Sequence, residues 1–387
     1  MNPHLPETVA LLDRLVAYPT VSSDSNLALI DDLAGRLEDC GACVELFRNE
    51  DATKANLFAT LGPESGGGIV LSGHTDVVPV TDQPWQSDPF KVHKSESRLY
   101  GRGTCDMKGF IAAAVVLAPE FAKADLTRPI HFAFTYDEEV GCLGGRALAE
   151  ELRKRDARPA LALIGEPTEM QVIDGHKGCC EYSVHFHGLE GHGSKPAEGV
   201  NAAEYAVRYA SELMSLRAEL EARAPEDSPF DPPWTTLNIG ALEGGVAHNV
   251  IASKARLDWE MRPVQPSDAD FVKAHLQELV ARKLLPAMRA IHPQADIITE
   301  IIGEVAGLAV MPENAARDLV AGLLGANGAG TVPFGTEAGL FQEIGMDVVI
   351  CGPGSIDQAH KADEFVSLDQ LDRCLGLLGK LGHSMTR

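Results

Sequence analysis

Side chains of the kind that bind metal ions stand where several predicted strands of this sequence end. The apolar run that begins at Ile69 reads as a buried strand, and it leads into His74 and Asp76. Further residues of this kind are Asp106, the adjacent pair Glu138 and Glu139, Glu166 and, near the end of the chain, His360. Ligand sites of α/β proteins lie beyond the carboxyl ends of parallel strands, so these side chains would converge on one edge of a sheet. Their nitrogen and oxygen atoms suit two divalent ions that share a bridging carboxylate.

Each of these residues, considered alone, also has an ordinary structural explanation. His74 could be a hydrogen-bonded histidine in a turn, with Asp76 as an acid of the same loop. The run Asp137-Glu138-Glu139 is typical of a solvated surface. The prediction of a metal site therefore depends on the joint pattern.

The elements that must position these side chains alternate between strands and helices. Helices are predicted at residues 6–17, 27–37, 109–124 and 145–154, and strands at residues 44–47, 56–61, 69–74, 129–135 and 160–164. This alternation is typical of an α/β fold with a mixed, largely parallel sheet that helices flank.

The length and the pattern together predict two domains. With 387 residues, the chain exceeds the roughly 250–300 residues at which one hydrophobic core stops growing. From about residue 178 the predicted order becomes strand, helix, strand, strand, helix, at residues 181–187, 201–222, 235–242, 255–261 and 268–285. We interpret residues 178–294 as an inserted α+β domain. The main domain then comprises residues 1–177 and 295–387, with a helix at 314–324, a strand at 348–351 and a helix at 368–381.

The composition argues against two classes of partner. The protein has 33 Lys and Arg against 56 Asp and Glu, and its net charge of −23 disfavours nucleic acid and anionic membranes. No segment approaches the ~20 apolar residues of a membrane-spanning helix, and the first residues lack the pattern of a signal peptide. The 8 cysteines are scattered, which favours reduced thiols. We therefore expect a cytoplasmic protein that binds a small molecule.

Five segments combine the candidate residues with characteristic neighbours: Ser72–Asp76, Gly103–Gly109, Asp137–Glu139, Gly165–Thr168 and Gly191–Ser194. In order and spacing they resemble the M20 metallopeptidase family of di-zinc amidohydrolases over nearly the whole chain. Within the family the chain is most similar to the acetylornithine deacetylases, because of further segments: His176–Gly178, Pro196–Ala202, Thr236–Asn238, Met261–Pro263, Gly335–Ala338, Gly352–Ser355 and Gln358–His360. The resemblance implies a zinc-peptidase-like catalytic domain with an inserted lid or dimerisation domain.

The resemblance also implies a role for each metal-binding residue. Asp106 would bridge two divalent ions. His74 and Glu166 would complete the site of one ion, and Glu139 and His360 the site of the other. The implied metal is zinc, although the same ligands also accept cobalt or manganese.

The residues next to these ligands are implied to act in catalysis. Glu138 corresponds to the family's general acid and base, which takes a proton during the metal-assisted attack on an amide and returns it to the departing amine. Asp76 corresponds to an acid that orients the ligand histidine. His192 corresponds to a histidine of the inserted domain that stabilises the oxyanion, often across the interface of a homodimer. A glycine-flanked surface turn is the alternative explanation for His192.

Two further residues are implied to contact the substrate. Arg262 corresponds to an arginine that binds the substrate carboxylate, a task that suits a guanidinium group, and Asn249 resembles a substrate-contacting asparagine. Arg262 could instead pair with an internal acid. Cys105, next to Asp106, departs from many relatives, and we expect its thiol to fill space rather than to bind metal.

The implied reaction is the hydrolysis of N2-acetyl-L-ornithine to L-ornithine and acetate, in arginine biosynthesis. Two alternatives share the metal site: an N-succinyl-diaminopimelate desuccinylase and a broad N-acyl-L-amino-acid deacylase. A non-catalytic amino-acid-binding protein on the same scaffold is an alternative of another class. The presence of every candidate ligand and of Glu138 disfavours that last alternative.

Overall fold

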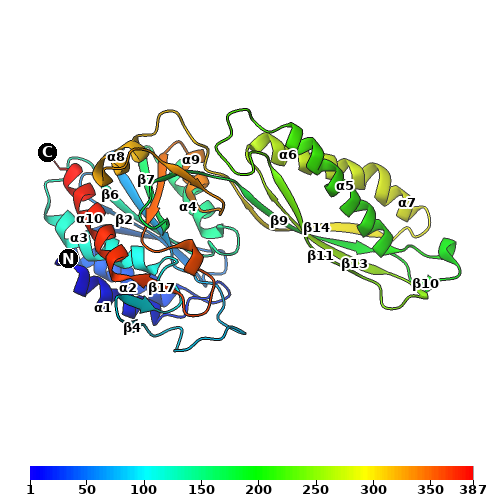
Figure 1. The fold of residues 1–387 in the computed structure, drawn as a ribbon, viewed down its shortest axis with the longest axis horizontal. Coiled ribbons are helices and arrows are strands. Elements are labelled where there is room, and N and C mark those ends of the chain that lie inside the picture. The colour runs from blue at the N-terminus through cyan, green and yellow to red at the C-terminus, as the bar shows by residue number, and fades with distance from the viewer. Residues whose placement is uncertain (387) are drawn as a thin grey trace. The chain divides into compact units, whose positions relative to one another are not determined.

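The computed structural model describes residues 1–386, and these form two compact units (Figure 1). The first unit contains residues 1–175 and 310–331 and the chain from residue 336 onward. The second unit contains residues 176–309 and the short segment 332–335. The second unit is thus an insertion in the sequence of the first.

The first unit is built on an eight-stranded sheet in the order β1-β2-β6-β3-β7-β16-β8-β15. The strands are β1 (Cys43–Arg48), β2 (Ala55–Leu61), β3 (Ile69–His74), β6 (Ile130–Thr135), β7 (Leu161–Pro167), β8 (Ile173–His176), β15 (Gly330–Val332) and β16 (Asp347–Gly352). The central strands β6, β3, β7 and β16 are parallel, whereas β1, β2 and β8 pair in antiparallel fashion. This sheet confirms the predicted mixed α/β class.

Helices cover both faces of this sheet. The longest are α1 (Leu5–Val16), α2 (Leu27–Asp39), α3 (Lys108–Lys123), α4 (Leu143–Arg153), α8 (Ala315–Leu324) and α10 (Leu368–Ser384), and α9 (Ala338–Glu343) is short. α3 packs between the sheet and α1 and α10, whereas α4 contacts α9 and β2. Because helices lie on both faces, every residue of β3, β6 and β7 is buried, which explains their continuous apolar sequences. None of the helices among residues 1–386 is long and apolar enough to span a membrane.

A small three-stranded sheet accompanies the main sheet in the first unit. It contains β4 (His93–Ser95), β5 (Arg98–Tyr100) and β17 (Phe365–Ser367), in the order β17-β5-β4. β5 pairs in antiparallel fashion with β17, with Tyr100 opposite Phe365. A 3-10 turn, η3 (Ile356–Gln358), precedes β17. This sheet brings the segment after residue 100 next to the segment around residue 364.

The second unit is a four-stranded antiparallel sheet with helices on one face. The sheet has the order β11-β13-β9-β14 and contains β9 (Cys179–His187), β11 (Thr236–Gly244), β13 (Lys254–Arg262) and β14 (Asp296–Val305). The helices are α5 (Ala202–Ala222), α6 (Pro266–Leu279), the π-helical segment η2 (Val280–Leu284) and α7 (Leu285–Arg289). A separate pair of short strands, β10 (Gly191–His192) and β12 (Val250–Ile251), and the 3-10 turn η1 (Pro196–Glu198) complete it. Side chains of β9 and β13 alternate between buried and more exposed positions, as expected where one sheet face is covered.

The second unit ends later in the sequence than predicted. The sequence predicts a return to the main domain at residue 295, but residues 296–305 form β14 of the second unit. β14 pairs with β9 from Asp296, opposite His187, to Val305, opposite Cys179. The second unit therefore extends to Ala309. β14 was missed because five consecutive residues of this edge strand are exposed, so its apolar residues do not alternate with polar ones.

Candidate metal centre

The parallel strands of the first unit place the predicted ligands at one edge of the sheet. β3 ends at His74, and Thr135 at the end of β6 lies opposite it, so that Glu138 and Glu139 follow at the same edge. β7 lies on the other side of β3 and carries Glu166 near its carboxyl end. Asp106 stands in the loop before α3. The convergence that the sequence predicted is therefore present in the fold.

Asp106 lies between two histidines. Nε2 of His74 is 3.0 Å from Oδ1 of Asp106, and Nε2 of His360 is 3.4 Å from Oδ2. Each carboxylate oxygen thus faces a different imidazole, which is the arrangement that a carboxylate bridging two ions requires.

The remaining predicted ligands lie on opposite sides of Asp106. Oε1 of Glu166 is 3.9 Å from Nε2 of His74, and Oε2 of Glu139 is 3.0 Å from Nε2 of His360. One ligand atom from each of His74, Asp106 and Glu139 lies within 4.8 Å of the others, so these three residues could hold an ion. The structure therefore gathers all five predicted ligands around Asp106, and the trio combines His74 and Glu139, which the prediction assigns to different ions.

The electrostatics of this group fit a cation. Burial raises the pKa of Glu166 well above its ordinary value, and the neighbouring charge of Asp106 adds to that effect. Burial and Asp106 likewise raise the pKa of Glu139. Burial also disfavours the charge of Asp106, but hydrogen bonds with His360 and His74 outweigh it and lower the Asp106 pKa. Hydrogen bonds to Asp106 and Glu139 raise the pKa of His360 to about 10. Divalent ions would relieve the repulsion among these carboxylates.

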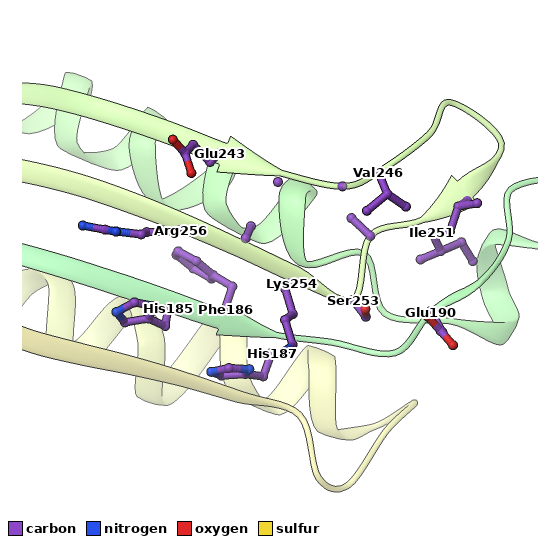
Figure 2. Close-up of a pocket in the computed structure, with 15 residues that line it drawn as sticks. His185, Phe186, His187, Glu190, Glu243, Val246, Ile251, Ser253, Lys254 and Arg256 are labelled. Atoms are coloured by element: carbon purple, nitrogen blue, oxygen red, sulfur yellow. The ribbon is translucent and has the colours of Figure 1, made fainter.

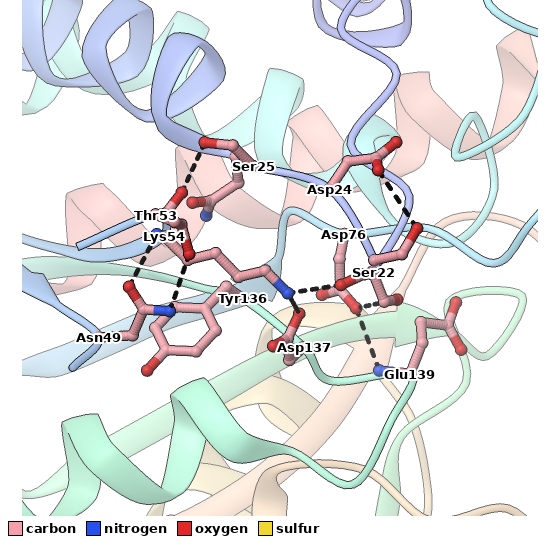
Figure 3. Close-up of polar contacts among 12 residues, drawn as sticks. Ser22, Asp24, Ser25, Asn49, Thr53, Lys54, Asp76, Tyr136, Asp137 and Glu139 are labelled. Carbon is pink, nitrogen blue, oxygen red and sulfur yellow. Dashed lines mark hydrogen bonds and ion pairs between the residues drawn. The ribbon is translucent and has the colours of Figure 1, made fainter. Parts of the chain in front are cut away.

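Asp76 contacts both His74 and the turn that carries the two glutamates, and Figure 3 shows its contact with the backbone of Glu139. Its backbone carbonyl lies 2.9 Å from Nδ1 of His74. Because a carbonyl oxygen only accepts, Nδ1 donates this hydrogen bond, and Nε2, which faces Asp106, is the ring nitrogen that would bind a metal ion in place of its own proton. The Asp76 carboxylate is 3.6 Å from Nδ1 and accepts hydrogen bonds from the backbone N–H groups of Glu138 at 3.1 Å and Glu139 at 3.3 Å, and from Ser22 at 2.7 Å.

Glu138 has the properties that a general base requires. Removal of its carboxyl group from solvent raises its pKa well above the ordinary value, and the charges of Glu139 and Asp106 add to this effect. A carboxyl group of raised pKa can both accept and return a proton near neutral pH. The buried thiol of Cys142 lies 3.5 Å from Oε1 of Glu138, where it can donate a weak hydrogen bond.

Several side chains near the centre were not predicted to take part. Arg102 and Glu364 form an ion pair of 2.7 Å, with each side chain only 1% exposed. Glu337 is also buried and accepts from Ser72 at 3.4 Å, and burial raises its pKa to about 7. Glu337 stands in a segment that carried the family resemblance, Gly335–Ala338, and Arg102 directly precedes another, Gly103–Gly109. Neither residue has a partner close in sequence that would have indicated its role.

Cys105 occupies the position that was predicted to fill space. Its buried thiol lies 3.3 Å from the backbone carbonyl of Ser355, and burial raises its pKa well above the ordinary value. A Cβ atom built on Gly354 would lie 2.5 Å from the Cys105 sulfur, so glycine is required there. The structure thus packs a neutral thiol against the loop that leads to His360.

The second unit brings His192 and Asn249 together. His192 lies opposite Val250 in the β10 and β12 pair, and the N–H of Gly193 donates to the Asn249 carbonyl at 2.8 Å. The backbone N–H of Ser194 donates to Nδ1 of the exposed His192 ring at 3.2 Å. The ring proton therefore resides on Nε2, which leaves an N–H group directed away from this turn.

Arg262 pairs with an internal acid, as its alternative explanation proposed. Its Nε and Nη2 atoms lie 3.1 and 2.8 Å from the same oxygen of Glu260. Glu260 also forms a second group that could hold a metal ion, with Cys179 and Glu181, but the guanidinium already neutralises it. The sequence did not indicate this pair.

A pocket of the second unit lies beside the ends of β9 and β13 (Figure 2). Its lining includes His185, His187, Lys254 and Arg256, and excludes His192, Asn249 and Arg262. Glu300 already pairs with His185, at 3.2 Å. We assign no function to this pocket.

Comparisons with known proteins identify the family. Residues 70–383 match the family described as Peptidase family M20/M25/M40. The chain belongs to this family. It is 34% identical to the acetylornithine deacetylase of Yersinia pseudotuberculosis serotype O:1b (strain IP 31758) over 392 residues, which cover 98% of each chain. The predicted family resemblance is therefore confirmed.

Solved structures of the same family share the fold. An M20 family metallo-carboxypeptidase, Sso-CP2 from Sulfolobus solfataricus, has a TM-score of 0.78 at 16% identity and covers 97% of this chain and 98% of its own. The Bacillus subtilis YXEP protein, described as a dinuclear metal binding peptidase from the M20 family, has a TM-score of 0.64 at 15% identity, with coverages of 98% and 97%. As an M20 metallopeptidase, the protein is a hydrolytic enzyme that acts on amides, and its family implies divalent metal ions.

We predict that Asp76→Asn weakens metal binding. An asparagine retains one carboxamide oxygen, so it cannot accept from Glu138, Glu139 and Ser22 as the carboxylate does. The ligand Glu139 should then lose its fixed position, and zinc affinity should fall about ten- to one-hundredfold. Isothermal titration of the metal-free protein measures this affinity. The exposed neighbour Asp24→Asn is the control, and equal affinities for both variants would contradict this role of Asp76.

Proposed function

We propose that the protein hydrolyses N2-acetyl-L-ornithine to L-ornithine and acetate. The observation that carries this proposal is the group of His74, Asp106 and Glu139 beside Glu138, in a chain that matches a relative named acetylornithine deacetylase over 98% of both lengths. We also propose that this reaction belongs to arginine biosynthesis. We also propose a cytoplasmic location, which the 8 free cysteines support.

The proposed cofactor is a pair of divalent ions, with Zn²⁺ as the first choice and Co²⁺ as a substitute. His74 and Glu166 would hold one ion, Glu139 and His360 the other, and Asp106 both. Bound there, the ions would polarise the substrate carbonyl and lower the pKa of a water molecule.

Protein side chains would move the protons. Glu138 would accept the proton of the attacking water and then deliver it to the amine nitrogen as the C–N bond breaks. His192 would stabilise the negative charge on the carbonyl oxygen, which the proton on its Nε2 atom supports. We propose that Asp76 keeps His74 in place and also holds the turn that carries Glu138 and Glu139, here called the glutamate turn.

Two residues of the second unit are proposed to bind the substrate. Arg262 would bind the α-carboxylate, and Asn249 would hydrogen-bond to the substrate close to His192. The pairing of Nε and Nη2 with Glu260 fixes the plane of the guanidinium and competes with this role, so the α-carboxylate would be bound through Nη1.

Substrate preference is tested by comparing kcat/KM for N-acetylornithine, N-succinyl-diaminopimelate and N-acetylmethionine. We expect N-acetylornithine to exceed the other two by at least about tenfold, the difference that 1.4 kcal/mol of transition-state binding produces. A preference for the succinyl substrate would identify a desuccinylase, and similar values for all three would identify a broad deacylase. Binding of all three without turnover by the metal-loaded protein would favour a binding protein.

We predict that Glu138→Gln removes turnover but keeps the metal ions. Glutamine preserves the size of the side chain and cannot accept the proton, so kcat should fall about 10²- to 10⁴-fold. Metal content by mass spectrometry should remain at the wild-type value. The exposed Glu150→Gln on α4 provides the control. Activity of Glu138→Gln within tenfold of wild type would contradict the assignment of the base.

We also propose a homodimer that forms through the second unit. β14 is an edge strand of its sheet, and it exposes Ile298, Ile301 and Ile302, which are 49%, 61% and 44% accessible. An apolar edge strand is a surface on which a second copy can pair its backbone. Such a dimer would also allow His192 to act in the site of its partner.

We predict that Ile301→Lys shifts the protein from dimer to monomer, because the charge would be buried in the interface. Light scattering after gel filtration measures the mass. Ile291→Lys, at an apolar position of the same unit that is 47% exposed and lies outside β14, is the control. A wild-type protein that is monomeric and fully active would contradict both the dimer and a role for His192 in the partner's site.

A further inference from the structure

A buried ion pair connects the two loops that carry Asp106 and His360. Nη1 of Arg102 lies 2.7 Å from Oε2 of Glu364, and both side chains are 1% exposed. Arg102 precedes Asp106 by four residues, and Glu364 follows His360 by four residues. The pair therefore joins the loop of the proposed bridging ligand to the loop of the histidine that faces it.

Glu364 holds the backbone at Asp106. Its Oε1 atom accepts hydrogen bonds from the N–H groups of Cys105 at 2.9 Å and Asp106 at 3.1 Å. Its backbone carbonyl accepts from the N–H of Gly101 at 2.9 Å, which continues the pairing of β5 with β17. One oxygen of the Glu364 carboxylate thus accepts hydrogen bonds from the peptide groups that orient Asp106, and the other oxygen pairs with Arg102.

Arg102 and Gln83 hold the backbone at His360. Nη1 of Arg102 lies 3.3 Å from the carbonyl of Lys361, and Nη2 donates to Oε1 of Gln83 at 2.6 Å. Gln83 in turn donates from Nε2 to the carbonyl of His360 at 3.0 Å. The ring of Trp85 covers the guanidinium at 5.1 Å, and its Nε1 donates to Gln83 at 3.1 Å. The planar, many-donor guanidinium serves all these contacts at once, which a lysine cannot do.

The need to position ligands explains this pair better than stability does. Removing two charges from water has a large cost, and apolar side chains of similar volume often stabilise a fold as well as a buried ion pair. His360 is 53% exposed and stands on a backbone of positive φ, 62°, so packing of its own side chain does not fix it. Its loop depends instead on the contacts with Gln83 and Arg102.

We propose that Arg102 and Glu364, with Gln83, are positioning residues of the metal centre that set the separation between Asp106 and His360. The inference rests on the proposed assignment of the metal ligands. The ion held by Asp106, Glu139 and His360 depends on both loops, whereas the ion held by His74 and Glu166 depends on only one of them. Loss of the contacts between the two loops should therefore lower the affinity for the first of these ions more than the affinity for the second.

The test is a zinc titration of the metal-free, full-length protein and its variants by calorimetry. In Arg102→Lys and Glu364→Gln, we expect one of the two binding steps to lose about ten- to one-hundredfold in affinity, with a smaller change in the other step. Gln83→Ala removes the contact to the His360 carbonyl and the acceptor that Arg102 and Trp85 share, but it keeps the Arg102–Glu364 pair, so it should give a smaller loss in the same step. Because Gln83 is half-buried, this variant tests the proposal even if a change in the buried pair impairs folding.

The control is Asp268→Asn in the second unit. Asp268 is also 1% exposed and pairs with an arginine, Arg223, at 3.2 Å, so its loss disturbs a comparable contact away from the metal ligands. Wild-type zinc affinities in Asp268→Asn and a selective loss in the other variants would support the proposal. Unchanged affinities in Gln83→Ala and Arg102→Lys, or an equal loss of both ions, would overturn it. A wild-type protein that binds fewer than two ions would contradict the proposed metal centre itself.

Discussion

Negative charge gathered at the carboxyl edge of the central sheet is the constraint on which the first unit depends. Asp106 directs its two oxygens toward His74 and His360, and Glu139 and Glu166 lie on either side. Burial and mutual repulsion disfavour the charged forms of both glutamates. Carboxylates that repel one another do not hold a fixed geometry unaided, so their backbones must be held by other groups. The hydrogen bonds that backbone N–H groups donate to the carboxylates of Asp76 and Glu364 meet this need.

The parts of the fold with continuous apolar segments were predictable from sequence. β3, β6 and β7 are buried on both faces, so their sequences are mostly apolar and all three strands were predicted. β7 extends to Pro167, three residues beyond its predicted end. β14 was not predictable in this way, because an exposed edge strand has neither continuous burial nor alternation. His74, Glu139 and Glu166 were found because they stand at or just beyond the ends of strands, whereas the role of each ligand came from the family resemblance. The partners Arg102 and Glu364 lie 262 residues apart in sequence, and no local pattern links such a pair.

The second unit shows a different limit of sequence reasoning. The residue types of His192, Asn249 and Arg262 suit contacts with a substrate, but only the fold shows their neighbours. The pairing of β10 with β12 places the first two in adjacent segments, and Glu260 orients the third. The tautomer of His192 follows from the backbone N–H of Ser194, a contact that residue identity alone does not specify.

The partner of the His74 ring proton is a main-chain atom, the carbonyl of Asp76. Main-chain carbonyls are present whatever side chain the codon specifies, so the tautomer of this histidine is independent of residue identity at position 76. The carboxylate at that position is then available for a separate task, the support of the glutamate turn. The backbone of Asp76 thus fixes the imidazole, while its carboxylate, 3.6 Å from the same ring nitrogen, anchors the peptide groups of Glu138 and Glu139. One residue thereby ties the orientation of a ligand ring to the position of the next ligand along the sheet edge.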